Sequence, residues 1–226
     1  MEQPTTGGSD ERLVRISAGE TELEGNLGLP ANARSVVLFA HGSGSSRHSP
    51  RNRFVARMLR EAGLATLLMD LLSAEEERVD ARTGTLRFDI GLLTRRLVAA
   101  AGWLRENPDT CRLNIGVFGA STGAAAALAT AAELPDAIGA VVSRGGRPDL
   151  TGPALASVRA PTLLLVGGHD HPVIEMNRAA MKALRCETKL EIVPGATHLF
   201  EEPDTLEQVA ALATQWFRRH LGVSRD

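Results

Sequence analysis

The chain has 226 residues and a formal net charge of −2, with 43% hydrophobic and 23% charged residues. This length suits one α/β domain with a fully buried sheet. The small net charge gives no global field that would attract nucleic acid or an anionic membrane. No apolar run approaches the roughly 18 residues that span a bilayer. We therefore expect a protein that binds neither nucleic acid nor membrane.

The N-terminal residues and the cysteines both bear on where in the cell the protein is located. Residues 1–12 are polar and lack the apolar run of a signal peptide, so we expect a flexible tail before a single domain over residues 13–222. Cys111 and Cys186 have no metal-ligand spacing, and such sparse cysteine usage favours a reducing, cytoplasmic location.

Eight strands are predicted, and helical patterns separate most of them. Residues 13–17 and 23–29, joined through Gly19-Glu20, are expected to open the chain as an antiparallel pair. The other strands are expected at residues 35–40, 64–69, 113–118, 137–142, 162–166 and 189–193. This alternation predicts a mostly parallel eight-stranded sheet with helices on both faces, in which the second strand is antiparallel to the rest.

The helices are predicted from apolar periodicity and from end signals. The first is expected to end at Gly63, another covers residues 88–106, and a third follows residue 121. The last is expected to begin at Asp204, where Asp-Thr-Leu-Glu has the spacing of a capping box. Residues 73–85, which contain three consecutive glutamates, are expected to form a polar loop in solvent.

The segment Gly119-Ala120-Ser121-Thr122-Gly123 carries the clearest chemical signal. It has the form Gly-x-Ser-x-Gly, with an apolar strand before it and an alanine-rich helix after it. This setting is typical of a nucleophile elbow, in which a serine lies on a sharp strand-to-helix turn. A Cβ at either glycine would crowd that turn. The motif therefore predicts a reactive hydroxyl at Ser121.

Further polar residues follow the ends of other predicted strands. Asp170 comes after the seventh strand, His198 after the eighth, and His41-Gly42-Ser43-Gly44 after the third. In a parallel sheet these carboxyl ends meet at one edge, where ligands bind. The order Ser121, Asp170, His198 is the triad order of α/β-hydrolases.

On these residues the chain resembles the α/β-hydrolases, and its compact size and loop pattern resemble small esterases similar to dienelactone hydrolase. The resemblance extends over about residues 20–222. It implies Ser121 as nucleophile, His198 as general base and then acid, and Asp170 as the group that orients His198. Dienelactone hydrolases proper carry cysteine as the nucleophile, so the serine here makes the dienelactone substrate doubtful while leaving ester hydrolysis intact.

Each group in this set has a physical property that its implied role requires. A serine hydroxyl is protonated at neutral pH and needs a base within hydrogen-bond reach, for which imidazole is suited. An aspartate fixes the tautomer of that imidazole and stabilises its cation. The backbone N–H groups of Ser43 and Thr122 are expected to bind the oxyanion of the reaction.

Several residues have two interpretations. Asp170 also fits a helix N-cap, and His198 a surface histidine. His41 fits a structural hydrogen-bonding group behind the oxyanion loop better than a catalytic or substrate-binding residue. Arg144, after the sixth strand, is either a solvated cation or a group that binds an anionic part of the substrate. His169 and His171 flank Asp170, but no further ligand completes a metal site, and we expect neither metal nor cofactor.

The expected function is hydrolysis of small carboxylic esters through an acyl-enzyme. Only residues 144–160 separate the sixth and seventh strands, which leaves no room for a large cap domain and favours an open site. A thioester, amide or lactone remains an alternative substrate, and a non-catalytic protein that binds a small ligand remains an alternative function. A homodimer, paired through the edge of the first strand, is also left open.

Overall fold

The computed structural model describes residues 11–222, and its centre is one eight-stranded sheet. The strand order is β1-β2-β4-β3-β5-β6-β7-β8. β2 is antiparallel to both β1 and β4, and all other neighbouring pairs are parallel. The strands are β1 (Glu11–Ala18), β2 (Thr21–Gly28), β3 (Ser35–Ala40), β4 (Ala65–Met69), β5 (Asn114–Ala120), β6 (Ile138–Arg144), β7 (Thr162–Gly167) and β8 (Thr188–Val193). The predicted α/β-hydrolase architecture and the antiparallel second strand are confirmed.

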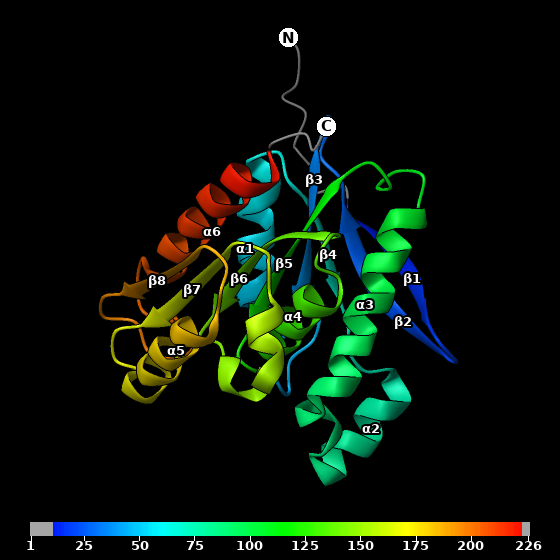
Figure 1. Ribbon diagram of the computed structural model, residues 1–226. Coiled ribbons are helices and arrows are strands. Elements are labelled where there is room, and N and C mark those ends of the chain that lie inside the picture. Colours follow the sequence, from blue (N-terminus) through cyan, green and yellow to red (C-terminus); the bar gives the residue numbers. More distant parts are fainter. Residues whose placement is uncertain (1–10, 223–226) are drawn as a thin grey trace.

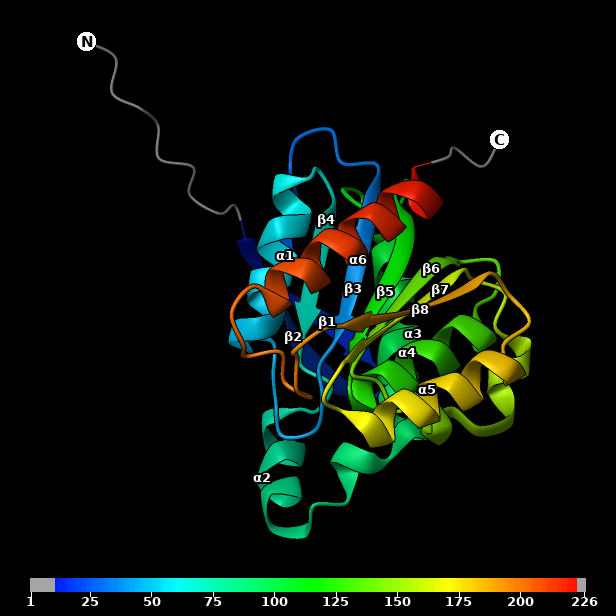
Figure 2. The same cartoon turned by 90° about the vertical axis from the view of Figure 1, so that its left-hand side faces the viewer.

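Helices cover both faces of this sheet (Figures 1 and 2). α1 and α6 pack on one face, where their buried side chains form one core cluster with β3, β5, β6 and β7. α3 and α4 contribute to the larger cluster on the other face. The helices are α1 (Pro50–Glu61), α2 (Ala74–Thr83), α3 (Ile90–Glu106), α4 (Thr122–Glu133), α5 (His171–Ala183) and α6 (Thr205–Leu221), with 3-10 turns η1 (Leu86–Phe88) and η2 (Pro148–Ser157).

Central strands are buried on both faces, as continuous apolar runs require. Every residue of β3, β4 and β7 is buried. α4 lies close to its neighbours because its first turns are built from alanines, with Ala124, Ala125, Ala126 and Ala127 all fully buried. Close packing of α4 fixes its N-terminus, and hence the residue that precedes it, relative to β5.

Two local predictions were wrong. Residues 73–85 are mostly helical, because Ser73 and Glu76 form the capping box that begins α2 and Glu76 also pairs with Arg96. α6, by contrast, lacks the predicted capping box. Asp204 has φ 62° and makes no side-chain cap bond, and Thr205 instead bonds to the carbonyl of Glu202 through both its N–H and its hydroxyl.

The first strand begins earlier than expected. β1 starts at Glu11, two residues inside the predicted tail, because Glu11 pairs with Gly28 along the strand and its carboxylate forms an ion pair with Arg60 at 2.6 Å. Residues 1–10 of that tail lie outside the described residues. Between β6 and β7 the described chain contains only η2, so no large cap domain covers the sheet there. No helix within residues 11–222 is both long and apolar enough to cross a bilayer.

Candidate active site

Ser121 occupies a strained turn between β5 and α4. Its backbone has φ 51° and ψ −120°, which a non-glycine residue adopts only when its surroundings hold it there. The Ser121 N–H donates to the carbonyl of Arg144 at 3.1 Å. Its own carbonyl accepts from the N–H groups of Ala124 and Arg147, at 3.1 and 3.2 Å. The expected strand–turn–helix setting is therefore present, and it presents the hydroxyl at the end of the sheet.

The two flanking glycines are required by close packing rather than by their dihedral angles. A Cβ on Gly119 would lie 2.4 Å from the Cα of Ala124. A Cβ on Gly123 would lie 2.4 Å from the carbonyl oxygens of both Ala40 and His41. Neither glycine has a positive φ. Their role is thus to let α4 and the β3 loop approach the turn.

Asp170 and His198, 28 residues apart, meet beyond the ends of β7 and β8. The Nδ1 of His198 lies 2.6 Å from an Oδ of Asp170. Asp170 sits at the N-cap position of α5 but makes no side-chain cap bond, so its carboxylate serves the histidine and not the helix. Because Nδ1 faces a carboxylate, it carries the proton, and Nε2 is left as the acceptor.

The loop that carries His198 is fixed by its neighbours. Thr197 donates its N–H and its hydroxyl to the Glu202 carboxylate, at 3.0 and 2.6 Å, and these bonds lower the pKa of Glu202. Gly145 lies against the imidazole, since a Cβ there would be 3.5 Å from two ring atoms of His198. Gly145 has φ 52°, a conformation that suits glycine. Asp170 and Gly145 therefore both lie next to the ring.

The loop after β3 passes directly over Ser121. A Cβ on Gly42 would lie 3.2 Å from the Cβ of Ser121. His41 fixes this loop, because its Nε2 accepts from the N–H of Leu71 at 3.0 Å and its Nδ1 lies 2.9 Å from the carbonyl of Gly42. Burial lowers the pKa of His41, which keeps the ring neutral. Both ring nitrogens are used within the fold, which favours its structural interpretation over substrate binding.

The residues predicted to supply the oxyanion donors both lie near Ser121. Thr122 is the first residue of α4, and Ser43 follows Gly42 in the loop above the turn. Within residues 11–222 no hydrogen bond engages the backbone N–H of either residue. Two free N–H groups beside a nucleophile are the arrangement that stabilises a developing oxyanion.

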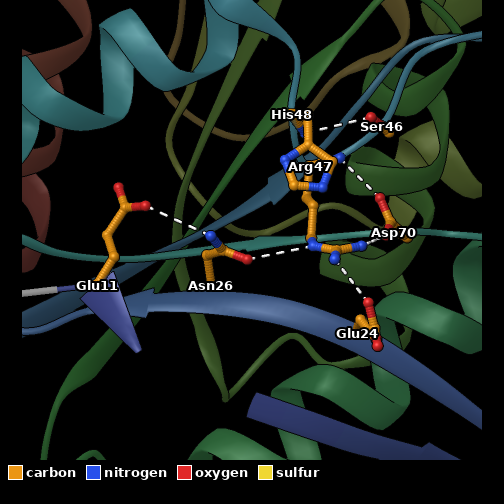
Figure 3. Close-up of polar contacts among 7 residues, drawn as sticks. All are labelled: Glu11, Glu24, Asn26, Ser46, Arg47, His48 and Asp70. Carbon is orange, nitrogen blue, oxygen red and sulfur yellow. Dashed lines mark hydrogen bonds and ion pairs between the residues drawn. The ribbon is translucent and has the colours of Figure 1, made fainter. Parts of the chain in front are cut away.

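Farther along the same loop, Arg47 ties it to two other strands (Figure 3). Its N–H donates to Asp70 at 2.7 Å, and its guanidinium bonds Asp70, Asn26 at 3.2 Å and Glu24 at 2.6 Å. Asp70 follows β4, and the other two acceptors lie on β2. Sequence reasoning left Arg47 without a role. Its partners could not be found from the sequence because they depend on β2 lying beside β4.

Ser121 and His198 line one pocket of about 220 Å³. Within the described residues no hydrogen bond joins the Ser121 hydroxyl to His198, and catalytic hydrogen bonds of this kind often tighten only around substrate. A larger cavity of about 490 Å³ is lined by the loop after β3, by Thr122 and His41 and by leucines. The two cavities share Gly42, Ser43, Ser45 and Ser49. The loop after β3 therefore borders both a small pocket at Ser121 and a larger, partly apolar one.

Arg144 also lines the small pocket. Its side chain is buried rather than solvated, with the residue 7% exposed, so one of its two expected interpretations is wrong. Burial, together with the nearby Arg51, lowers its pKa to about 10, and the guanidinium stays charged at neutral pH. Arg51 lines the same pocket and was not singled out from the sequence. It follows the third strand by eleven residues, too far for the strand-end rule to find it.

His169 and His171 do not form a metal site with Asp170. No group of three or more histidine, cysteine or acidic side chains within residues 11–222 has the arrangement to hold a metal ion.

The chain matches one protein family and is similar to solved structures. The sequence model of the "Dienelactone hydrolase family" matches residues 23–221. A solved structure described as dienelactone hydrolase from Anabaena variabilis is 60% identical, covers 94% of this chain and 98% of its own, and superposes with a TM-score of 0.93. Est1E from Butyrivibrio proteoclasticus, 17% identical over 93% of this chain and 99% of its own, has a TM-score of 0.76 and shares the fold.

Two curated relatives from strains of Mycobacterium tuberculosis bear a different description. Each is named "Putative phosphoribosyl transferase" and is 57% identical over 208 residues, which is 92% of this chain. The matched part is 46% of each relative, so the chain spans about half the length of these proteins.

Proposed function

The chain belongs to the dienelactone hydrolase family, and from this premise we propose that it hydrolyses small carboxylic esters through an acyl-enzyme on Ser121. The observation that carries the proposal is the 2.6 Å contact between His198 and Asp170 beside the strained Ser121 turn. A backbone held at positive φ by its surroundings is typical of functional sites.

In the first half of the reaction, the Ser121 oxygen attacks the ester carbonyl carbon while Nε2 of His198 takes the hydroxyl proton. The negative oxygen that forms is stabilised by the N–H groups of Ser43 and Thr122. One such donor lowers the barrier by about 3–4 kcal/mol. The carbon–oxygen bond to the alcohol then breaks, and His198 returns the proton to the departing alcohol.

In the second half, His198 removes a proton from a water molecule as that water attacks the acyl-enzyme. The bond to Ser121 breaks, the serine oxygen regains its proton from His198, and the carboxylic acid leaves. Asp170 keeps Nδ1 protonated and stabilises the imidazolium in both halves. No step requires a group other than those described.

The test is hydrolysis of p-nitrophenyl acetate by the Ser121→Ala variant. Loss of the alkoxide nucleophile should lower kcat roughly 10⁴-fold or more. A fluorophosphonate probe should form a phosphorus–oxygen bond to Ser121 of the wild type, with loss of fluoride, and should not label the variant. Unchanged turnover in Ser121→Ala would remove the proposed mechanism. Absence of both turnover and a Ser121 adduct in the wild type would favour a protein that only binds a small ligand.

A lactone is a second candidate substrate. The Anabaena structure described as a dienelactone hydrolase, at 60% identity, supports it. A lactone is a cyclic ester, so the same three residues would open its ring. The product would be one molecule that carries both the carboxylic acid and the alcohol. Comparing kcat/KM for a small lactone with that for p-nitrophenyl acetate ranks the two, and preference for the open-chain ester would set the lactone aside.

A further inference from the structure

Arg144 is a buried cation that no group within residues 11–222 neutralises. Its side chain makes no hydrogen bond or ion pair with any residue in the described range 11–222, and its Nη1 is buried without a partner. A charged group out of water costs several kcal/mol unless it is paired and hydrogen-bonded. Such a residue persists when function requires it, because binding sites tolerate local instability.

The position of Arg144 directs that charge toward the reacting centre. It is the last residue of β6, pairs with Ala120 in the sheet, and accepts the N–H of Ser121 through its carbonyl. Arg144 lines the same 220 Å³ pocket as Ser121 and His198. A ligand group that binds Arg144 would therefore belong to a molecule that also occupies the pocket at Ser121.

A second positive feature faces the same pocket from α1. The first turn of this 12-residue helix lines the pocket at Ser49, Arg51 and Asn52. Helix N-termini carry a partial positive charge that attracts anions, although here Pro50 has no N–H and the N–H of Asn52 already donates to the Ser49 hydroxyl. Arg51 adds a guanidinium whose Nε is buried without a partner, although its Nη1 pairs with Glu201 at 2.6 Å. No acidic side chain of the described residues lines this pocket.

From these observations, and resting on the proposed ester hydrolysis, we infer that the pocket is an anion subsite and that the ester substrate carries a phosphate monoester. Arg144, at the end of β6, binds the phosphate. Arg51 and the N-terminus of α1 bind the same phosphate. The scissile ester of the same molecule lies at Ser121.

Charge and donor count favour phosphate over carboxylate. Two guanidiniums and a helix N-terminus face the pocket, while the single acidic partner, Glu201, has a side chain 60% exposed and is screened by solvent. A phosphate monoester carries roughly −1.5 to −2 charge and three acceptor oxygens. A carboxylate carries one charge on two oxygens in a plane, and a single guanidinium satisfies it.

The first test measures binding without turnover, in the Ser121→Ala variant. Inorganic phosphate should raise its melting temperature at constant ionic strength, and succinate at equal concentration should raise it less. Arg144→Gln added to this variant should weaken phosphate binding about tenfold or more, and Arg51→Gln about threefold or more. The matched control is Arg15→Gln, which removes an exposed arginine on β1 and should leave phosphate binding unchanged.

Two outcomes overturn the inference. One is phosphate binding that survives Arg144→Gln and Arg51→Gln alike. The other is stabilisation by succinate that equals or exceeds that by phosphate, which would assign the subsite to a carboxylate. Because binding is measured in a variant that cannot turn over, failure of the ester hydrolysis does not affect this readout.

The second test uses a matched pair of substrates, 1-acetylglycerol 3-phosphate and 1-acetylglycerol, with acetate release as the measurement. Wild type should prefer the phosphate-bearing ester at least tenfold in kcat/KM, and Arg144→Gln should bring this ratio close to one. If wild type hydrolyses both esters with the same kcat/KM, the phosphate subsite is overturned and the proposed ester hydrolysis is retained. Phosphate binding without hydrolysis of either ester overturns the hydrolase and leaves the subsite.

Discussion

Replacing Arg144 with methionine should make the protein more stable. Burial and Arg51 lower the pKa of Arg144 from 12.5 to about 10. At about 1.4 kcal/mol for each tenfold change in the acidity constant, the charged form costs roughly 3 kcal/mol in the folded state. Methionine fills most of the same volume with an apolar chain, and imperfect repacking should cost about 1 kcal/mol. The expected net gain is about 2 kcal/mol.

Urea denaturation at pH 7 in a phosphate-free buffer measures this gain. For a domain of this size a gain of about 2 kcal/mol also raises Tm by about 4–8 °C. Phosphate should then narrow the difference in stability between Arg144→Met and wild type, since it binds the protein that retains Arg144 more tightly. A loss of more than about 1 kcal/mol in Arg144→Met would show that the guanidinium is held by the fold, and the argument from an unpaired charge would be refuted.

Three further predictions follow from the loop and turn around Ser121. Gly123→Ala should destabilise the fold by about 3 kcal/mol, because the new Cβ meets two carbonyl oxygens at 2.4 Å; urea midpoints measure it. Arg47→Met should lower kcat on the order of 10²-fold with a smaller change in KM, because the loop that carries the Ser43 N–H loses its ties to β2 and β4; ester hydrolysis measures it. Burial lowers the pKa of His41, so stability should fall as pH drops below about 6.5, where the unfolded chain takes up a proton that the folded ring resists; His41→Gln should show less of this acid sensitivity.

Each of these three predictions has a control variant or an outcome that would contradict it. Gly102→Ala, where a Cβ meets nothing within 4 Å in the middle of α3, should instead stabilise by about 0.5–1 kcal/mol. Equal effects at the two glycines would contradict the close-packing argument. Arg47→Met acting on KM alone would place Arg47 in substrate binding. A His41→Gln profile that follows the wild type below pH 6.5 would assign the acid sensitivity to another group.

The errors made from sequence have identifiable physical causes. Ser73 and Glu76 have capping-box spacing, but the three glutamates that follow Ala74 were interpreted as solvated loop, although acidic residues in the first turn stabilise a helix N-terminus. Asp204 has the same spacing to Glu207, yet its backbone is left-handed and its side chain cannot cap α6. The pattern is local in both cases, and the direction of the incoming chain decided which box formed.

The sequence by itself determined the sheet, the strained serine turn and the order Ser121, Asp170, His198. These follow from local periodicity, small residues and the rule that parallel strands end at one edge. It could not decide whether two arginines, Arg47 in the loop after β3 and Arg144 at the end of β6, would find ionic partners. Arg47 became fully paired because β2 lies beside β4 and brings Glu24 near Asp70. Arg144 is buried and has no partner within residues 11–222, because it ends β6 beside Ser121 and lines a pocket that the start of α1 also lines. Ion pairing depends on which strands are neighbours, and only the tertiary structure decides that.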